Sequence, residues 1–288
     1  MPSQKPLVAI LAPGNMGAAI GGRLVDNGLE VRTSLAGRTE GSAERARTAG
    51  LTVTDDAGLA EADIFLSVVP PSQVTALAER MAPVLTASRR KPVFVEANAV
   101  SPDTARQVAA LIAPTGCVFV DGGIVGGPPR QGYSPTLYLS GPDAARAAVL
   151  GDYGVRVGVM DGPVGAASAL KMCYAGINKG LIAIGSAMIL AAGRAGAADT
   201  LLEELARSQP NLLAKFSTAL PDMFSKAHRW APEMEEIAAF AGADPAAAQV
   251  YRGFAELYAR LAEDSPAEAG EIAALAAFAA AANEEVSK

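Results

Sequence analysis

A lysine in a stretch without acidic residues is the residue of this chain best suited to proton chemistry. Lys171 lies in GPVGAASALKMCYAGINKG, residues 162–180, and no acidic residue occurs within seven positions on either side. Burial disfavours the charged form of an amine, so its pKa moves toward the range in which a general acid or base works. The alternative is a surface lysine whose aliphatic stem covers apolar area.

A glycine-containing turn near the N-terminus indicates a bound dinucleotide. The apolar run Leu7–Leu11 leads directly into APGNMG, and a helical pattern follows. This is the dinucleotide fingerprint with alanine at its first glycine position. Gly14 lets the backbone approach a pyrophosphate, and Gly17 lets the helix pack on the strand. The helix N-terminus adds free N–H groups for the anion. An ordinary strand–helix turn is the alternative.

The residues after the second expected strand favour NADP over NAD. Arg38 lies 21 positions after Gly17, where a guanidinium can hold a 2′-phosphate with help from the Thr39 hydroxyl. An NAD enzyme usually carries an acid near this point. Glu40 could serve as that acid if the loop shifts, so NAD stays possible.

Later strand ends supply further candidate ligands, because parallel sheets bind ligands at the carboxyl ends of their strands. One expected strand ends in VVPP and the next in EANA. Asn98 could hydrogen-bond the nicotinamide ribose or carboxamide, or be a turn residue. In DGGIVGGPP, residues 121–129, Gly126 and Gly127 could offer backbone N–H groups to a substrate carboxylate or hydroxyl. A plain turn is again the alternative.

Composition excludes several classes of function. The net charge of −6 gives no general attraction to nucleic acid or to an anionic membrane. Cys117 and Cys173 form no Cys-x-x-Cys pair, and His228 is the one histidine. We therefore expect neither a disulfide framework nor a metal site, and no Ser-His-Asp triad.

The pattern of strands and helices predicts the architecture. The expected strands are Leu7–Leu11, Glu30–Ser34, Leu51–Thr54, Ile64–Val69, Val93–Ala97, Val118–Asp121, Leu137–Ser140 and Val155–Met160. Helical patterns lie between most of them, and the later helices are Ala166–Ala192, Asp199–Ser208, Leu212–Lys226, Pro232–Gly242, Ala246–Asp264 and Pro266–Glu285. Alternation of this kind predicts an α/β Rossmann-type, doubly wound parallel sheet, followed by an all-α C-terminal domain joined by a long helix. The expected domains are residues 1–161 and 162–288.

The chain is expected to be a soluble cytoplasmic protein. MPSQKP is too short and polar to open a signal peptide, and the apolar run Gly180–Leu190 is too short to span a bilayer. The long helix 166–192 carries apolar or small residues on every face, which predicts a homodimer rather than a solvated helix.

Together these segments resemble the β-hydroxyacid dehydrogenase superfamily, which includes 6-phosphogluconate dehydrogenase. The matching segments are AILAPGNMGAAIGGRL, ADIFLSVVPPSQV, VEANAVSPDTA, FVDGGIVGG, TLYLSGP and GPVGAASALKMCYAGINKG. The helical tail with HRWAPEMEEIA resembles the branch whose C-terminal domain is described only as phosphogluconate-dehydrogenase-like. The resemblance implies metal-free hydride transfer, with the lysine at position 171 exchanging the hydroxyl proton, and dimers or tetramers formed through the helical domain.

The resemblance also implies roles for other residues. Those that would line the cofactor are Gly14, Asn15, Met16, Gly17, Arg38, Val69, Pro70 and Asn98, and those that would line the substrate are Val125, Gly126 and Gly127. Trp230 could line a larger substrate pocket, and Glu233 could meet a polar substrate group, although a core position and a solvated helix face are the simpler interpretations.

Four positions depart from the family pattern. Val125 stands where the family usually has a carboxylate-binding serine, and Ala175 where it has an asparagine. Tyr174 and Asn178 replace a histidine and the catalytic glutamate of 6-phosphogluconate dehydrogenase, and their spacing puts them on the helix face of Lys171. Coupled decarboxylation is therefore not expected.

The sequence thus predicts an NADP-preferring dehydrogenase or reductase acting on a hydroxy acid or a related alcohol or ketone. Its small-molecule substrate stays unnamed, and Lys171, Tyr174 and Asn178 are the candidate catalytic residues. Imine reduction is one alternative, although imine reductases usually lack the lysine. A cofactor-binding redox sensor without turnover is the other.

Overall fold

The computed structural model describes residues 5–264 and 270–287, and its internal contacts divide the chain within one helix. The sheet unit comprises Met1–Met172 and the helical unit Cys173–Lys288. Each unit is described by itself. The domain limits expected at residues 161 and 162 stay a prediction.

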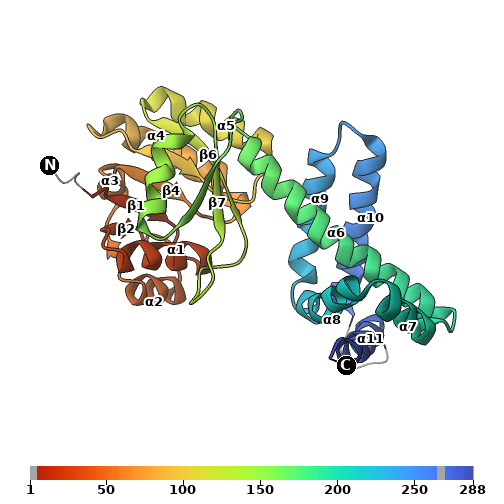
Figure 1. Ribbon diagram of the computed structural model, residues 1–288. Coiled ribbons are helices and arrows are strands. Elements are labelled where there is room, and N and C mark those ends of the chain that lie inside the picture. Colours follow the sequence, from red (N-terminus) through yellow and green to blue (C-terminus); the bar gives the residue numbers. More distant parts are fainter. Residues whose placement is uncertain (1–4, 265–269, 288) are drawn as a thin grey trace. The chain divides into compact units, whose positions relative to one another are not determined.

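The sheet unit contains an eight-stranded sheet in the order β3-β2-β1-β4-β5-β6-β7-β8 (Figure 1). The strands are β1 (Val8–Leu11), β2 (Val31–Thr33), β3 (Thr52–Val53), β4 (Ile64–Ser67), β5 (Val93–Glu96), β6 (Val118–Val125), β7 (Thr136–Ser140) and β8 (Arg156–Val159). All eight predicted strands are confirmed, and the sheet is parallel from β3 to β6. The predicted parallel, doubly wound sheet is confirmed, with one exception at β7, which runs antiparallel to β6 because the chain returns through a hairpin.

Helices cover both faces of this sheet, which is why its strands are almost continuously apolar. In β1, Val8 and Ile10 join the core formed with α1 (Asn15–Asp26) and α2 (Glu40–Thr48). Ala9 and Leu11 point the other way, toward α3 (Asp56–Ala60), α4 (Val74–Ala87) and α5 (Pro102–Ile112). The strand order reverses between β1 and β4, and in such sheets ligands bind outside the carboxyl ends of the strands at that point.

Local signals explain where these helices begin and end. Ser101 accepts a hydrogen bond from the Thr104 N–H, and Pro102 takes the first position of α5, as its sequence predicts. Gly28 follows α1 with φ of +87°, a conformation that favours glycine.

The helical unit holds the later part of α6 (Ala166–Arg194) and the helices α7 (Ala198–Ser208), α8 (Pro210–Phe224), α9 (Ala227–Phe240), α10 (Pro245–Glu263) and α11 (Glu271–Val286). The all-helical prediction is confirmed. One boundary is corrected, since α9 begins five residues before Pro232, where the sequence predicted a helix start. Pro221 lies inside α8, as it does inside the predicted helix 212–226. Packing of buried residues such as Leu220, Met223 and Met234 offsets the hydrogen bond that each internal proline removes. The first residues of the predicted helix 266–285 lie outside the described residues.

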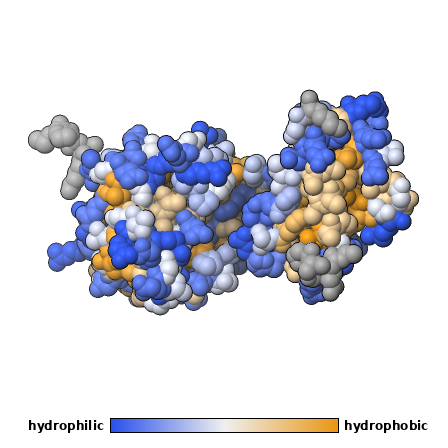
Figure 2. Space-filling model, turned by 90° about the horizontal axis from the view of Figure 1, so that it is seen from below, coloured by the Kyte–Doolittle hydropathy of each residue, from blue (hydrophilic) through white to orange (hydrophobic). Residues whose placement is uncertain are grey.

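Helix α6 is the longest helix that the structure describes. By length and composition alone it could cross a membrane, a test that the core helix of a soluble protein also passes. Figure 2 shows a broad hydrophobic area on one face of the helical unit.

Candidate functional site

The turn between β1 and α1 forms an open cradle at the carboxyl edge of the sheet. A Cβ added to Gly14 would meet no atom within 4 Å, whereas one on Gly17 would lie 2.1 Å from the Ala12 carbonyl oxygen. Gly14 is the N-cap of α1 and caps it with no side chain, so the first N–H groups of the helix stay available. Asn15 is exposed and Met16 is half-buried on the core. The open space at Gly14, the free N–H groups and the positive end of the helix dipole all suit a bound pyrophosphate.

Arg38 lies beyond β2 beside other polar side chains. Its Nη1 donates to Gln73 Oε1 at 3.4 Å, and burial together with the charge of Arg80 lowers its pKa. Thr39 is the N-cap of α2 and makes no capping hydrogen bond through its side chain. Its hydroxyl lies 3.3 Å from the Ser42 hydroxyl. These groups form a positive, donor-rich corner suited to an added phosphate.

Asn98 joins the ends of two strands. Its Oδ1 accepts the Val69 N–H at 2.5 Å, and its Nδ2 donates to Ser67 Oγ at 2.8 Å. Asn98 and Val69 are buried, whereas the following Pro70 is exposed. The amide therefore shapes the turn after β4.

The glycine pair after β6 is engaged by a tyrosine that the sequence did not single out. Val125 is the last residue of β6 and is half-buried. Gly126 has φ of +121°, and a Cβ added to it would lie 2.3 Å from the Tyr133 hydroxyl. The Gly127 N–H donates to that hydroxyl at 3.2 Å. Any substrate contact by this N–H therefore replaces or shares the bond to Tyr133.

The start of α6 is attached to β6 by a buried carboxylate. Asp121 Oδ2 accepts the N–H groups of Gly165 and Ala167, each at 2.9 Å, and that of Ser168 at 3.2 Å. The hydroxyls of Ser168 and Ser140 donate to the same carboxylate at 2.6 and 2.7 Å. A carboxylate at this position satisfies the orphan N–H groups and complements the helix dipole. The first turn of the lysine-bearing helix is thereby fixed to the sheet.

Two glycines of β6 then allow α6 to pack directly on the strand. A Cβ on Gly123 would lie 2.6 Å from the Ala167 carbonyl oxygen and 3.4 Å from Lys171 Cβ, so Lys171 rests against this position. A Cβ on Gly122 would lie 2.8 Å from the Glu96 carbonyl oxygen. Glycine here is thus required for close approach between neighbouring elements rather than for a turn.

Lys171 and Glu96 are electrostatically coupled at this edge of the sheet. Burial lowers the pKa of Lys171 to about 8, and the charge of Glu96 opposes that shift. Burial raises the pKa of Glu96 to about 7, offset by the Asn98 N–H, by the side chains of Ser67 and Asn98, and by Lys171. Lys171 keeps some exposed surface, but its amine is surrounded by enough protein for burial to dominate.

Sequence reasoning missed Glu96 and Asp121 as members of the site. The two are paired residues on β5 and β6, and both are fully buried. An acidic residue at the end of each of two apolar strands was the available signal, because buried carboxylates are rare unless they have partners.

The remaining candidates lie in the helical unit. Tyr174 is 53% exposed, and its carbonyl accepts from Asn178 Nδ2 at 2.9 Å. Asn178 Oδ1 accepts from Lys215 Nζ at 2.9 Å. Trp230 and Glu233 meet around Lys179, which forms an ion pair with Glu233 and lies 5.5 Å from the Trp230 ring centroid.

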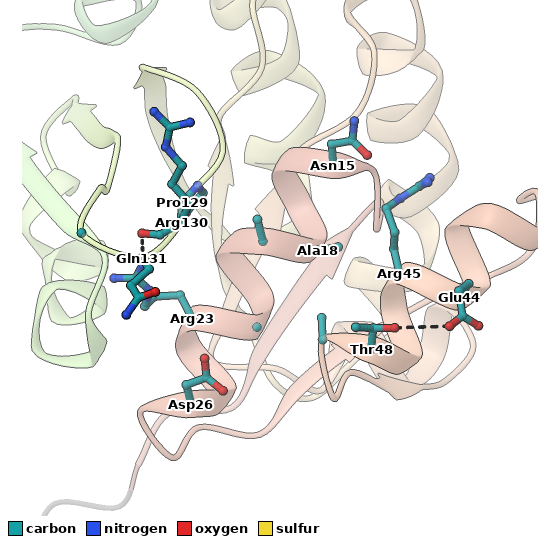
Figure 3. Close-up of a pocket in the computed structure, with 14 residues that line it drawn as sticks. Asn15, Ala18, Arg23, Asp26, Glu44, Arg45, Thr48, Pro129, Arg130 and Gln131 are labelled. Atoms are coloured by element: carbon teal, nitrogen blue, oxygen red, sulfur yellow. Dashed lines mark hydrogen bonds between the residues drawn. The ribbon is translucent and has the colours of Figure 1, made fainter.

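A separate groove of about 810 Å³ follows the outer side of α1 (Figure 3). It runs from Asn15 between α2 and the loop at Arg130, and Arg23 and Arg45 also line it. Arg23 donates to the Arg130 carbonyl at 3.2 Å. Its lining does not include Lys171. Within the described part of the chain, no group of three His, Cys, Asp or Glu residues could hold a metal ion.

The fold and the glycine cradle define a nucleotide-binding Rossmann protein of the dehydrogenase type. Residues 8–151 match the NAD binding domain of 6-phosphogluconate dehydrogenase, and residues 192–261 match a domain of unknown function (DUF1932). The chain therefore belongs to the 6-phosphogluconate dehydrogenase-like family of NAD-binding proteins, as its motifs predict.

Two relatives support this assignment. An uncharacterized 28.5 kDa protein from Methanothermus fervidus is 30% identical over 63% of this chain and 69% of its own length. A probable 3-hydroxyisobutyrate dehydrogenase from Mycobacterium bovis is 28% identical over 58% of this chain. The match spans 57% of that relative's length, which is less than two thirds.

Solved structures share the fold over nearly the whole chain. A conserved protein described as similar to 3-hydroxyacid dehydrogenases is 29% identical, with a TM-score of 0.72 and coverage of 90% of this chain and 100% of that one. The 3-hydroxyisobutyrate dehydrogenase of Mycobacterium tuberculosis has a TM-score of 0.68 at 20% identity, covering 96% and 99%. An imine reductase from Myxococcus stipitatus in complex with NADP+ has a TM-score of 0.58 at 20% identity, covering 95% and 99%.

Proposed function

We propose that this protein is an NAD(P)-dependent oxidoreductase that interconverts a hydroxy acid, or a related alcohol, and its carbonyl form. NADP is the favoured cofactor, and Lys171 is the general acid and base. The observation that carries the proposal is a lysine of lowered pKa, attached through Asp121 and Gly123 to a Rossmann sheet that also holds a pyrophosphate cradle.

The role of each group in the reaction follows from its chemistry. The bound nicotinamide supplies or accepts the hydride. In oxidation, the neutral Lys171 amine takes the hydroxyl proton; in reduction, its ammonium gives a proton to the carbonyl oxygen. An amine with a pKa near 8 has both forms available around neutral pH.

The remaining candidates have supporting positions in this proposal. The turn of Gly14 to Gly17 would hold the pyrophosphate, and Arg38 with Thr39 would hold the 2′-phosphate. Val69, Pro70 and Asn98 would line the nicotinamide end, and Val125, Gly126 and Gly127 the substrate. Tyr174 and Asn178 are proposed as further catalytic residues, and Trp230 and Glu233 as substrate-binding residues.

A substrate screen combined with one substitution tests the proposal. Hydroxy acids, alcohols, ketones and cyclic imines are assayed with NADPH or NADP and with NADH or NAD. Lys171→Met is expected to lower kcat by about 10²- to 10⁴-fold while the dissociation constant of the cofactor stays within about twofold. Lys226→Met, at an ion-paired lysine in the turn between α8 and α9, is the matched control and keeps full activity.

Three results would contradict the proposal in different ways. A Lys171→Met variant that also loses cofactor binding would leave the lysine without a proton-transfer role. Turnover of cyclic imines but not of ketones would support imine reduction, which the fold shared with imine reductases keeps open. Cofactor binding with no turnover across the panel would support a redox sensor.

A further inference from the structure

We propose that Glu96 is a positioning residue for Lys171: the charge of its buried carboxylate favours the protonated form of the amine. This inference rests on the proposed function of Lys171 as the proton-transfer group. Glu96 is the buried titratable group at this edge of the sheet to which the mechanism above gives no role.

The environment of Glu96 is the first argument. The side chain is fully buried at the end of β5, and its Oε1 accepts the Asn98 N–H at 2.9 Å. Its Oε2 is buried and has no hydrogen-bond partner among the described residues. An ionised carboxylate left in this state is costly, so Glu96 needs either a proton or a nearby cation.

The sheet places such a cation on the same face as the carboxyl group. Glu96 pairs with Asp121 in register, so its side chain leaves the sheet on the face of Asp121 and Gly123, against which Lys171 packs. Gly122 and Gly123 carry no side chains. A Cβ at Gly122 would contact the Glu96 carbonyl oxygen, and a Cβ at Gly123 would contact the Ala167 carbonyl oxygen and Lys171 Cβ. Side chains at either position would force apart β5, β6 and α6. The glycine pair therefore sets the approach of the helix that carries the lysine to the strand that carries the acid.

The other charged groups near Lys171 do not stabilise its protonated form in this way. Asp121, opposite Glu96 on β6, has both carboxylate oxygens occupied by the start of α6 and by Ser140. Helix α6 carries no acidic residue within seven positions of Lys171. Glu96 is the one charged group whose attraction raises the pKa of Lys171.

The proton balance of the pair is simple. In reduction, the carbonyl carbon gains a hydride, the carbonyl oxygen takes a proton from the Lys171 ammonium, and a neutral amine remains. Solvent then reprotonates that amine, and the charge of the Glu96 carboxylate stabilises the ammonium that forms again. Oxidation runs through the same steps in reverse. Removing the acid therefore favours the neutral amine and the oxidising direction at a given pH.

The test is the titration of Lys171 itself, which needs no turnover. Protein labelled with [ε-¹³C]lysine is titrated by NMR, and Lys171→Met assigns the signal. Glu96→Gln keeps the size of the side chain and removes its charge, and we expect it to lower the Lys171 titration midpoint by about one pH unit. Glu96→Asp, which restores the charge on a shorter side chain, is expected to give a midpoint between the two.

The controls separate this inference from a structural role and from the proposed function. Glu79→Gln, at an exposed position of α4, should leave the midpoint unchanged. A Glu96→Gln protein that melts at a different temperature but titrates like the wild type would overturn the inference. If no substrate is turned over, the proposed function fails. The NMR titration still shows whether the charge of Glu96 affects the protonation of Lys171. With a substrate in hand, the pH midpoint of oxidation should move down together with the NMR midpoint.

Discussion

Ser168 donates two hydrogen bonds to Asp121, from its hydroxyl at 2.6 Å and from its backbone N–H at 3.2 Å. Both residues are fully buried, and they join the middle of a strand to the first turn of the helix that carries Lys171. The position of the lysine thus depends on a carboxylate that lies 50 residues earlier in the chain.

Asp121→Asn is expected to detach this helix start. The amide places a donor where the backbone N–H groups need an acceptor, so the unfolding free energy of the sheet unit should fall by roughly 3 kcal/mol or more. Thermal unfolding and amide hydrogen exchange at residues 165–168 measure the effect. Asp103→Asn, at an exposed position of α5, is the control and should change stability by about 0.5 kcal/mol or less. Unchanged exchange protection in the Asp121 variant would contradict this account.

The rate of catalysis should depend on pH in opposite ways for the two directions. Because the pKa of Lys171 is lowered to about 8, the amine is mostly protonated below that pH and mostly neutral above it. Oxidation needs the neutral amine, so its kcat/KM should rise as the pH increases through about 8. Reduction needs the ammonium, so its kcat/KM should fall over the same range. Initial rates in both directions between pH 6 and 10 provide the measurement, and parallel profiles would contradict the assignment of Lys171.

Arg38→Ala should change the choice of cofactor. Loss of a charge-assisted contact to the 2′-phosphate is worth about 1.5–3 kcal/mol, so kcat/KM for NADP should fall by roughly 10- to 100-fold. The value for NAD should change by less than about threefold, because NAD lacks that phosphate. Arg89→Ala, in the loop before β5, serves as a control and should leave the ratio of the two cofactors unchanged. An equal loss for both cofactors would instead point to a general effect on the fold.

An apolar stripe on α6 predicts association of the helical units of two chains. Ile177, Ile184 and Met188 are 67%, 52% and 59% exposed, and their spacing places them on one side of the helix. Exposed apolar side chains gathered in this way are typical of interfaces, and the hydrophobic area in Figure 2 lies on this unit.

Light scattering at micromolar concentration should therefore give a homodimer. Ile184→Glu combined with Met188→Glu should convert it to a monomer, because two buried charges would have no partners in the interface. Glu substitution at Val250, which is also exposed but lies on α10, should leave the dimer intact. A wild-type monomer would refute the prediction.

The sequence predicted the fold well because its signals are local. Continuous apolar runs bounded by turns mark strands that are covered on both faces, and Ser101 with Pro102 marks a helix start regardless of what lies far away. The antiparallel β7 and the proline inside α9 were not predicted, because a strand's direction and the tolerance of a proline depend on packing partners rather than on neighbours in sequence.

For the candidate site, residue types and spacing alone determined the glycine cradle, the arginine after β2 and an isolated lysine on a long helix. The tertiary structure decided what surrounds that lysine. It pairs Glu96 with Asp121 across two strands, and Asp121 binds the start of α6. The missing side chain of Gly123 lets Lys171 pack against the sheet. These relationships join segments far apart in the chain, and burial acts on an amine only after those segments have packed around it.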